Sequence, residues 1–116
     1  MYIGVVGGRT YPDKDFVHSI LHDFIKKGDT IISGGASGVD SFAKEFAEIA
    51  ELLFVCYPPL EADGEDAYTK RNQRIADDCE LLLVFPSYNS VGTYDTIAKA
   101  KKAGKRIIVF PIPRVD

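Results

Sequence analysis

The sequence predicts an α/β fold, a single three-layer α/β/α Rossmann-like domain built on a five-stranded parallel sheet. Short runs that are apolar throughout alternate with helical patterns, and no repeat or linker interrupts them. Strands that are hydrophobic on both faces are typical of a parallel sheet covered by helices on both sides. The chain has 116 residues, of which 46% are hydrophobic, enough for one compact core and too few for two ordinary domains. We therefore assign residues 1–116 to one domain.

The first strand, helix and second strand are each marked by their own pattern. The apolar run Tyr2–Val6 predicts the first strand. The segment Lys14–Lys27 has apolar residues at helical spacing, and Gly28 follows it as the glycine expected after a helix. The apolar run Thr30–Ser33 then predicts the second strand.

The middle of the chain repeats this alternation. An apolar face at helical spacing predicts a helix over Val39–Ala50, and the run Leu52–Cys56 predicts a third strand that is hydrophobic on both faces. Two prolines end that strand, because proline lacks the N–H group that a strand needs. We expect an acidic loop at Glu61–Glu65 and a third helix over Asp66–Asp77.

The last third supplies the fourth and fifth strands, at Glu80–Phe85 and Arg106–Phe110, with a helix over Gly92–Ala103 between them. Right-handed crossovers then give a doubly wound sheet, for which we expect the strand order 3-2-1-4-5. In that order the chain reverses direction between strands one and four. Ligands bind such folds in the crevice beyond the carboxyl ends of these strands.

Hydropathy and net charge argue against a membrane protein and against a protein that binds nucleic acid over its whole surface. No apolar run approaches the roughly 20 residues of a membrane span, and the N-terminus shows no charged leader, so we expect a cytoplasmic protein without a membrane partner. A net charge of −3 argues against attraction of nucleic acid to the whole surface, although a local basic patch stays open.

Metal, cofactor and nucleophile motifs are not recognisable in the sequence. Cys56 and Cys79 have neither a CxxC spacing nor histidine companions, and we interpret both as small core residues. His18 and His22 lie four residues apart on one helix, but no glutamate follows His18, and we interpret both as facing solvent. We expect neither a bound metal nor a cofactor.

Three loops at the predicted crevice carry the pattern of a phosphate site: the first loop is Gly7–Thr10, the second is Gly34–Asp40 and the third is Pro86–Thr93. Glycines let the backbone approach an anion closely, and the helices that follow offer unpaired N–H groups and the positive end of the helix dipole. An arginine in the first loop provides a charged fork for phosphate, and hydroxyl side chains add further donors. The candidate ligand-binding residues in these loops are Gly7, Gly8, Arg9, Thr10, Ser33, Gly34, Gly35, Ser37, Gly38, Asp40, Pro86, Ser90, Gly92 and Thr93.

Asp40 in this list has a structural interpretation as well, and four further residues are candidates for contact with a ligand. Asp40 in a first helical turn also complements the helix dipole. Arg71 and Asn72 suit a phosphate and a sugar or base, yet they lie in a charged stretch of the kind that often faces solvent. Tyr88 could stack on a base, and Asn89 is the other candidate reader of a base in these loops.

The order of these motifs resembles the SLOG superfamily of Rossmann-like domains, which includes the DNA-processing protein A group and the Lonely Guy phosphoribohydrolases. The resemblance covers nearly the whole chain and is closest to small stand-alone SLOG proteins and to the DNA-processing core. It is carried by Gly7-Gly8-Arg9, Ser33-Gly34-Gly35-Ala36-Ser37-Gly38-Val39-Asp40, Arg71-Asn72 and Gly92-Thr93. It implies binding of nucleotides, nucleotide-derived signals or single-stranded DNA, and it makes a homodimer plausible.

The enzyme branch of this superfamily differs from the sequence at its catalytic position. The phosphoribohydrolases carry Pro-Gly-Gly-x-Gly-Thr-x-x-Glu with a catalytic glutamate, and the equivalent residue here is Thr96. The neighbouring Asp95, one position out of register, is the remaining candidate catalyst. We therefore predict binding or sensing of a nucleotide-type phosphorylated ligand. Single-stranded DNA binding and hydrolysis of nucleoside monophosphates are the alternatives.

Overall fold

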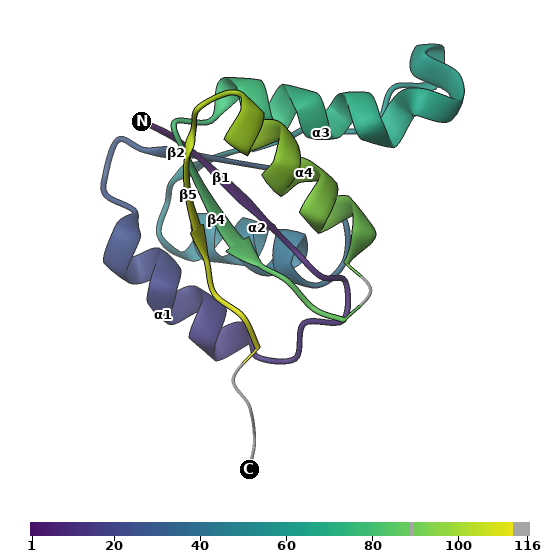
Figure 1. Cartoon of the computed structure of the whole chain (residues 1–116). Helices are drawn as coiled ribbons and strands as arrows, with labels where there is room; N and C mark the ends of the chain where they lie inside the picture. Colours follow the sequence, from purple (N-terminus) through teal and green to yellow (C-terminus); the bar gives the residue numbers. More distant parts are fainter. Residues whose placement is uncertain (89, 113–116) are drawn as a thin grey trace.

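The computed structural model describes residues 1–88 and 90–112 and contains one five-stranded sheet with the strand order β3-β2-β1-β4-β5 (Figure 1). All four strand pairings are parallel. The predicted fold class and strand order are confirmed. The longest register joins β1 to β4, from Ile3 opposite Leu81 to Gly7 opposite Phe85, at the point where the chain reverses direction.

Helices and strands alternate as the sequence predicts. Their bounds are β1 Tyr2–Gly7, α1 Lys14–Phe24, β2 Thr30–Ser33, α2 Val39–Ile49, β3 Leu53–Cys56, the 3₁₀ helix η1 Glu61–Asp66, α3 Ala67–Asp78, β4 Leu81–Phe85, α4 Val91–Lys102 and β5 Arg106–Val109.

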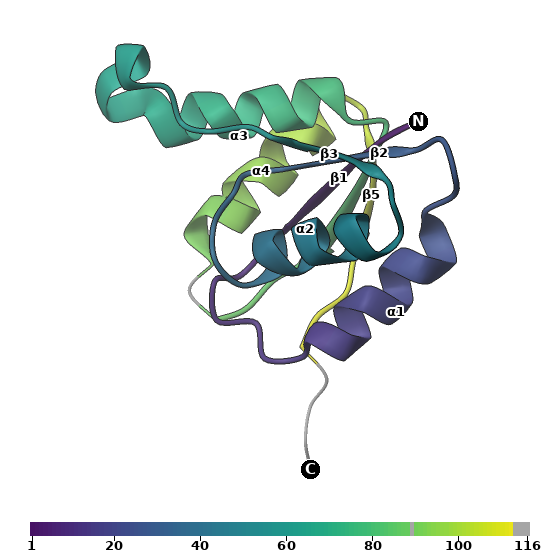
Figure 2. The ribbon, with the colours of Figure 1, turned by 180° about the vertical axis from the view of Figure 1, so that it is seen from behind.

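Two helices cover each face of the sheet, which gives the three predicted layers (Figures 1 and 2). On one face, α1 and α2 pack through Val17, Leu21 and Phe46 against inward-facing strand residues such as Val5. On the other face, α3 and α4 bury Ile75 and their neighbours against Val6, Ile32 and Leu82. Alternate residues of one strand therefore enter two different cores, which is why the central strands are apolar throughout.

Most element bounds agree with the prediction to within one residue, and two segments differ by more. Helix α1 ends at Phe24, three residues before the predicted end, because Ile25 turns to an extended conformation and its N–H still donates to the Leu21 carbonyl at 2.9 Å. The predicted acidic loop is the 3₁₀ helix η1, which together with the start of α3 projects beyond the sheet (Figures 1 and 2).

Two side-chain interpretations were wrong. Cys79 is buried as expected, but Cys56 is exposed because it ends the edge strand β3, where Leu53 and Val55 are also exposed. His18 is half-buried and does not face solvent, because its Nε2 lies 2.9 Å from the Phe42 carbonyl oxygen and its ring packs edge-on against Phe46.

Within residues 1–88 and 90–112, no helix combines the length and the apolar character needed to cross a membrane.

Candidate functional site

A cleft of about 790 Å³ opens at the carboxyl ends of β1, β2 and β4, where the sequence places the binding loops. A volume of this size is typical of small-molecule sites. The side chains and backbone of three loops and of the facing parts of α3 and α4 form its wall. The wall contains Val6, Gly7, Gly8, Arg9, Thr10, Gly34, Ala36, Asp40, Tyr68, Thr69, Arg71, Asn72, Ile75, Ser87, Tyr88, Ser90, Val91, Gly92, Thr93, Asp95 and Thr96.

The first loop is wedged between the other two. The Gly8 N–H donates to the Phe85 carbonyl at 3.0 Å, and the Gly8 carbonyl accepts from the Val39 N–H at 3.3 Å. A Cβ on Gly8 would collide with the Ser87 hydroxyl, and one on Gly38 would collide with the Gly8 carbonyl. These two glycines are therefore required by the contact between loops, and the three loops form one packed unit.

Two helix N-termini meet this unit. Helix α2 begins after Gly38 and helix α4 after Ser90, and neither N-cap residue makes a side-chain hydrogen bond to its helix. The first N–H groups of a helix have no partner inside the helix and carry partial positive charge. The Val39 N–H of α2 is taken by the Gly8 carbonyl, but Asp40 of α2 and residues 91–93 of α4 line the cleft, so an anion there would lie near both helix N-termini.

The start of α4 combines open backbone with a threonine hydroxyl. A Cβ on Gly92 would meet no atom of the described residues within 4 Å, so packing against them does not explain the glycine there. Thr93 is only 7% exposed and lines the cleft, and among the described residues no hydrogen bond involves its hydroxyl. Backbone N–H groups, the glycine and the Thr93 hydroxyl together form a cradle suited to a phosphate.

Arg71 and Asn72 line the cleft, but the protein itself occupies their polar groups. The Arg71 guanidinium donates to the Gly34 carbonyl at 2.6 Å and to the Asn72 Oδ1 at 2.9 Å. The Asn72 amide donates in turn to the Asp95 carboxylate at 3.0 Å and to the Gly92 carbonyl at 3.4 Å. The pair thus ties the second loop to the start of α4 across the cleft.

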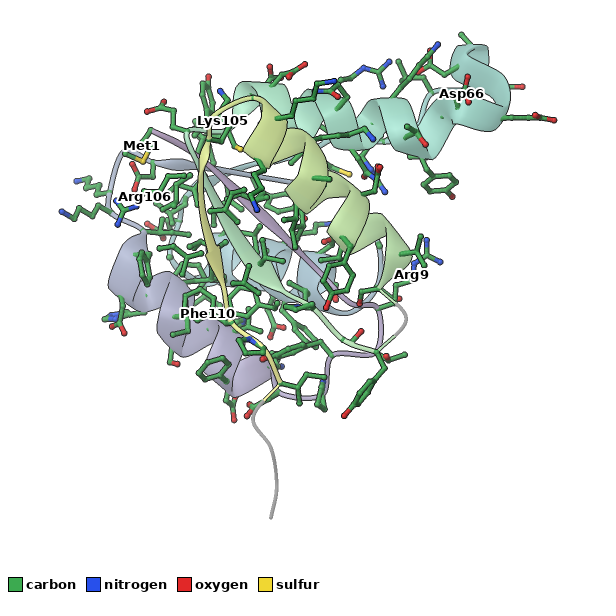
Figure 3. The ribbon with its side chains drawn as sticks, viewed as in Figure 1. Met1, Arg9, Asp66, Lys105, Arg106 and Phe110 are labelled. Atoms are coloured by element: carbon green, nitrogen blue, oxygen red, sulfur yellow. The ribbon has the colours of Figure 1, made fainter. Side chains whose placement is uncertain are left out.

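Arg9 is the exposed cation of the cleft wall. Of the two arginines that line the cleft, Arg71 is buried and Arg9 is exposed. Figure 3 shows Arg9 beside the N-terminal end of α4, and Thr10 next to it is also exposed. Arg9 can therefore reach the outer side of an anion held at the helix N-termini.

Two carboxylates that line the cleft, Asp40 and Asp95, have pKa values shifted in opposite directions. Burial raises the pKa of Asp40 above its ordinary value, although the Ala36 N–H and the charge of Arg71 act to lower it. Burial acts to raise the pKa of Asp95 too, but hydrogen bonds from Lys99 and Asn72 outweigh it and lower the pKa overall. Asp95 is therefore ionised at neutral pH, which does not suit it to act as a general acid.

Asp40→Asn is expected to change how stability depends on pH. Because the folded-state pKa of Asp40 is raised, its contribution to stability is fully present below the unfolded value near 3.8 and is lost as pH rises through the folded-state pKa. The free energy of unfolding of the wild type, measured in urea relative to that of Asp40→Asn, should therefore fall over this range. Asp23→Asn, on the exposed part of α1, is the matched control. A difference that rises with pH would contradict the interpretation.

Five candidate binding residues lie outside the cleft wall. Ser33 is buried and donates to the Val5 carbonyl at 2.7 Å, and Gly35 lies beside Cys56. Gly38 packs under the first loop, Ser37 is exposed, and Pro86 is buried at the end of β4. The other candidates in the three loops, with Arg71 and Asn72, line the cleft.

Sequence reasoning missed two residues of α3 that line the cleft, Tyr68 and Thr69. Tyr68 is 56% exposed, and the Arg71 guanidinium lies 5.4 Å from the centre of its ring. Tyr68 lies three residues before Arg71, a spacing that places the two side chains on one helix face, and this spacing was the available signal for Tyr68. Tyr88 also lines the cleft and is 88% exposed, whereas Asn89 lies outside the described residues.

Comparison with known proteins relates the chain to DNA-processing proteins. A family model for DNA recombination-mediator protein A matches residues 1–56. The Gene 61 protein of Mycobacterium phage D29 is 30% identical over 116 aligned positions, which cover 91% of this chain and 93% of the phage protein.

Solved structures agree with the fold. DNA processing protein A (DprA) from Streptococcus pneumoniae matches with a TM-score of 0.84 and 18% identity over 99% of this chain, which spans about half of that protein (52%). The structure of DprA from Helicobacter pylori, described for its single-stranded DNA binding mode, matches with a TM-score of 0.79 and 19% identity, covering 100% of this chain and 67% of that one.

Proposed function

Because this chain belongs to the SLOG superfamily of Rossmann-like domains, as a protein similar to DNA-processing protein A, we propose that it binds a nucleotide or a nucleotide-derived ligand. The phosphate would lie between the N-termini of α2 and α4, with Arg9 on its outer side. The remainder of the ligand would extend toward α3, where Tyr68 offers an exposed ring.

The observation that carries this proposal is the cradle at the start of α4. No described atom lies within 4 Å of the Gly92 Cβ position, whereas other glycines of the loops are covered by protein, and Thr93 lines the cleft without a hydrogen bond from its hydroxyl to any described residue. Both features are explained by a ligand atom in the cleft. Neither is needed for the contacts between the loops.

Gly92→Ala is expected to keep the fold and lose the ligand. An added methyl group meets no protein atom, and alanine is better than glycine in a helix by up to about 1 kcal/mol, so the melting temperature should stay equal or rise. The same methyl group would fill the phosphate cradle and lower affinity roughly tenfold or more, about 1.4 kcal/mol.

The measurement is calorimetric titration with AMP, GMP, CMP, UMP, cyclic AMP and inorganic phosphate, supported by thermal shifts. Ala98→Gly, on the exposed face of α4 outside the cleft, is the reciprocal control and should lower the melting temperature without changing affinity. Unchanged affinity of Gly92→Ala, or no binding of any probe by folded wild type, would rule out the proposed phosphate site.

A second candidate function is single-stranded DNA binding, which the match to the H. pylori protein favours. Tyr68 and Tyr88, both exposed on the cleft wall, would serve as stacking surfaces for bases. In the same titrations an oligo(dT) strand would then bind more tightly than any mononucleotide. Its affinity would fall steeply with salt, because each phosphate contact releases counterions.

The homodimer, expected from the family resemblance, and the cytoplasmic location, expected from the sequence pattern, stay predictions. Light scattering of the purified chain at micromolar concentration distinguishes a dimer from a monomer.

A further inference from the structure

The cleft contains a carboxylate that the proposed phosphate site does not use. Asp95 lies on α4 and lines the cleft, and its side chain is 34% exposed. Asn72 Nδ2 donates to its Oδ2 at 3.0 Å, and Lys99 Nζ donates to its Oδ1 at 2.5 Å. The carboxylate is therefore held in one orientation at the cleft wall.

This carboxylate has room for further donors. Two carboxylate oxygens offer about four acceptor positions, and the described residues fill two of them. Asn72 cannot turn away, because its own Oδ1 accepts from Arg71 and its amide also bonds the Gly92 carbonyl. The acceptor is thus oriented before any ligand arrives.

The position of Asp95 relative to the cradle indicates what it would meet. It follows Gly92 by three residues on the same helix, which places it on the same face about 4.5 Å further along the axis. In a nucleotide the group bonded to the phosphate is the sugar, and the base lies beyond the sugar. A carboxylate less than one helical turn from the phosphate therefore faces the sugar, whose hydroxyl groups are hydrogen-bond donors.

Resting on the proposed function, we propose that Asp95 accepts hydrogen bonds from ribose hydroxyl groups, so that the cleft takes ribonucleotides in preference to 2′-deoxyribonucleotides. Asp95 thus acts as a binding residue that determines specificity. Asn72, whose side chain is itself fixed by Arg71 and the Gly92 carbonyl, is a positioning residue that acts through it.

The test compares matched pairs of phosphorylated sugars and nucleotides on the folded wild type. Ribose 5-phosphate is titrated against 2-deoxyribose 5-phosphate, and AMP, GMP, CMP and UMP against their 2′-deoxy forms. A hydrogen bond to a charged group predicts roughly 10- to 100-fold weaker binding of the deoxy compound. No variant has to fold for this comparison.

Two variants test the Asp95 carboxylate and its ion pair with Lys99 separately. In Asp95→Asn the substituted amide has one acceptor oxygen, which Asn72 occupies, so the preference for the ribose compound should shrink to about threefold or less. Lys99→Met removes the ion pair but leaves the carboxylate, so the preference should persist. Asp23→Asn, on α1 and outside the cleft, should keep the wild-type preference.

The outcomes distinguish this inference from the function on which it rests. If neither sugar phosphate nor any nucleotide binds, the proposed function fails. If ribose and deoxyribose compounds bind the wild type equally, or Asp95→Asn keeps the full preference, phosphate binding stands and the role of Asp95 is overturned.

Discussion

Gly38→Ala is expected to destabilise the protein by roughly 3 to 6 kcal/mol, because two separate costs coincide at this position. Gly38 has φ 75° and ψ −129°, a conformation that alanine adopts only with strain. Its Cβ would also lie 2.5 Å from the Arg9 carbonyl oxygen, which is backbone and cannot rotate away. Urea unfolding should show the loss, and the melting temperature should fall by roughly 10 °C or more.

Gly64→Ala is the matched control for this prediction. Gly64 has nearly the same backbone conformation, φ 59° and ψ −130°, but nothing lies within 4 Å of its Cβ position. The control therefore carries the backbone strain alone, about 1 to 3 kcal/mol. The difference between the two variants measures the contact between the first and second loops. Equal destabilisation would mean that this contact contributes nothing.

Most of the fold could be predicted because its determinants are local and repeated. The central strands are apolar on both faces since each faces two cores, and this pattern leaves few alternatives to a parallel sheet covered on both sides. The strand order followed from right-handed crossovers and the usual doubly wound arrangement. From that order, the meeting of the three loops at one cleft followed as well.

The errors lie where tertiary contacts override the local pattern. Ile25 continues the apolar stripe of α1 yet leaves the helix, because an extended conformation still buries its side chain to 8% exposure. Cys56 belongs to an apolar run, but its strand is at the edge of the sheet and the position of an edge is a global property. Neither outcome has a signal in the neighbouring residues.

The glycines of the loops show that local sequence also fails to reveal tertiary contacts within the site. The sequence marks Gly8, Gly38 and Gly92 alike as residues that admit a phosphate. In the structure the Cβ positions of Gly8 and Gly38 collide with neighbouring loops, whereas Gly92 lines the cleft with no described atom within 4 Å of its Cβ position. The distinction depends on contacts between segments far apart in the chain, so no motif in one loop could reveal it.

Arg71→Met is expected to lower the free energy of unfolding by about 2 to 4 kcal/mol, because it breaks a buried network and leaves its acceptors unpaired. Arg71 is only 9% exposed, and its guanidinium joins the Gly34 carbonyl at 2.6 Å to the Asn72 side chain at 2.9 Å. Amide hydrogen exchange should rise in the Gly34–Asp40 segment, and nucleotide affinity should fall with it.

This result decides between two roles for Arg71, because a residue whose fork only held phosphate would lose affinity without losing stability. Lys70→Met is the matched control, since Lys70 is adjacent, exposed and 3.8 Å from Asp63. Such a surface pair contributes at most about 1 kcal/mol. If Arg71→Met unfolds like this control and loses only affinity, the arginine is a ligand residue. If stability and exchange protection fall together, it holds the second loop in place, and the phosphate depends on helix N-termini and Arg9.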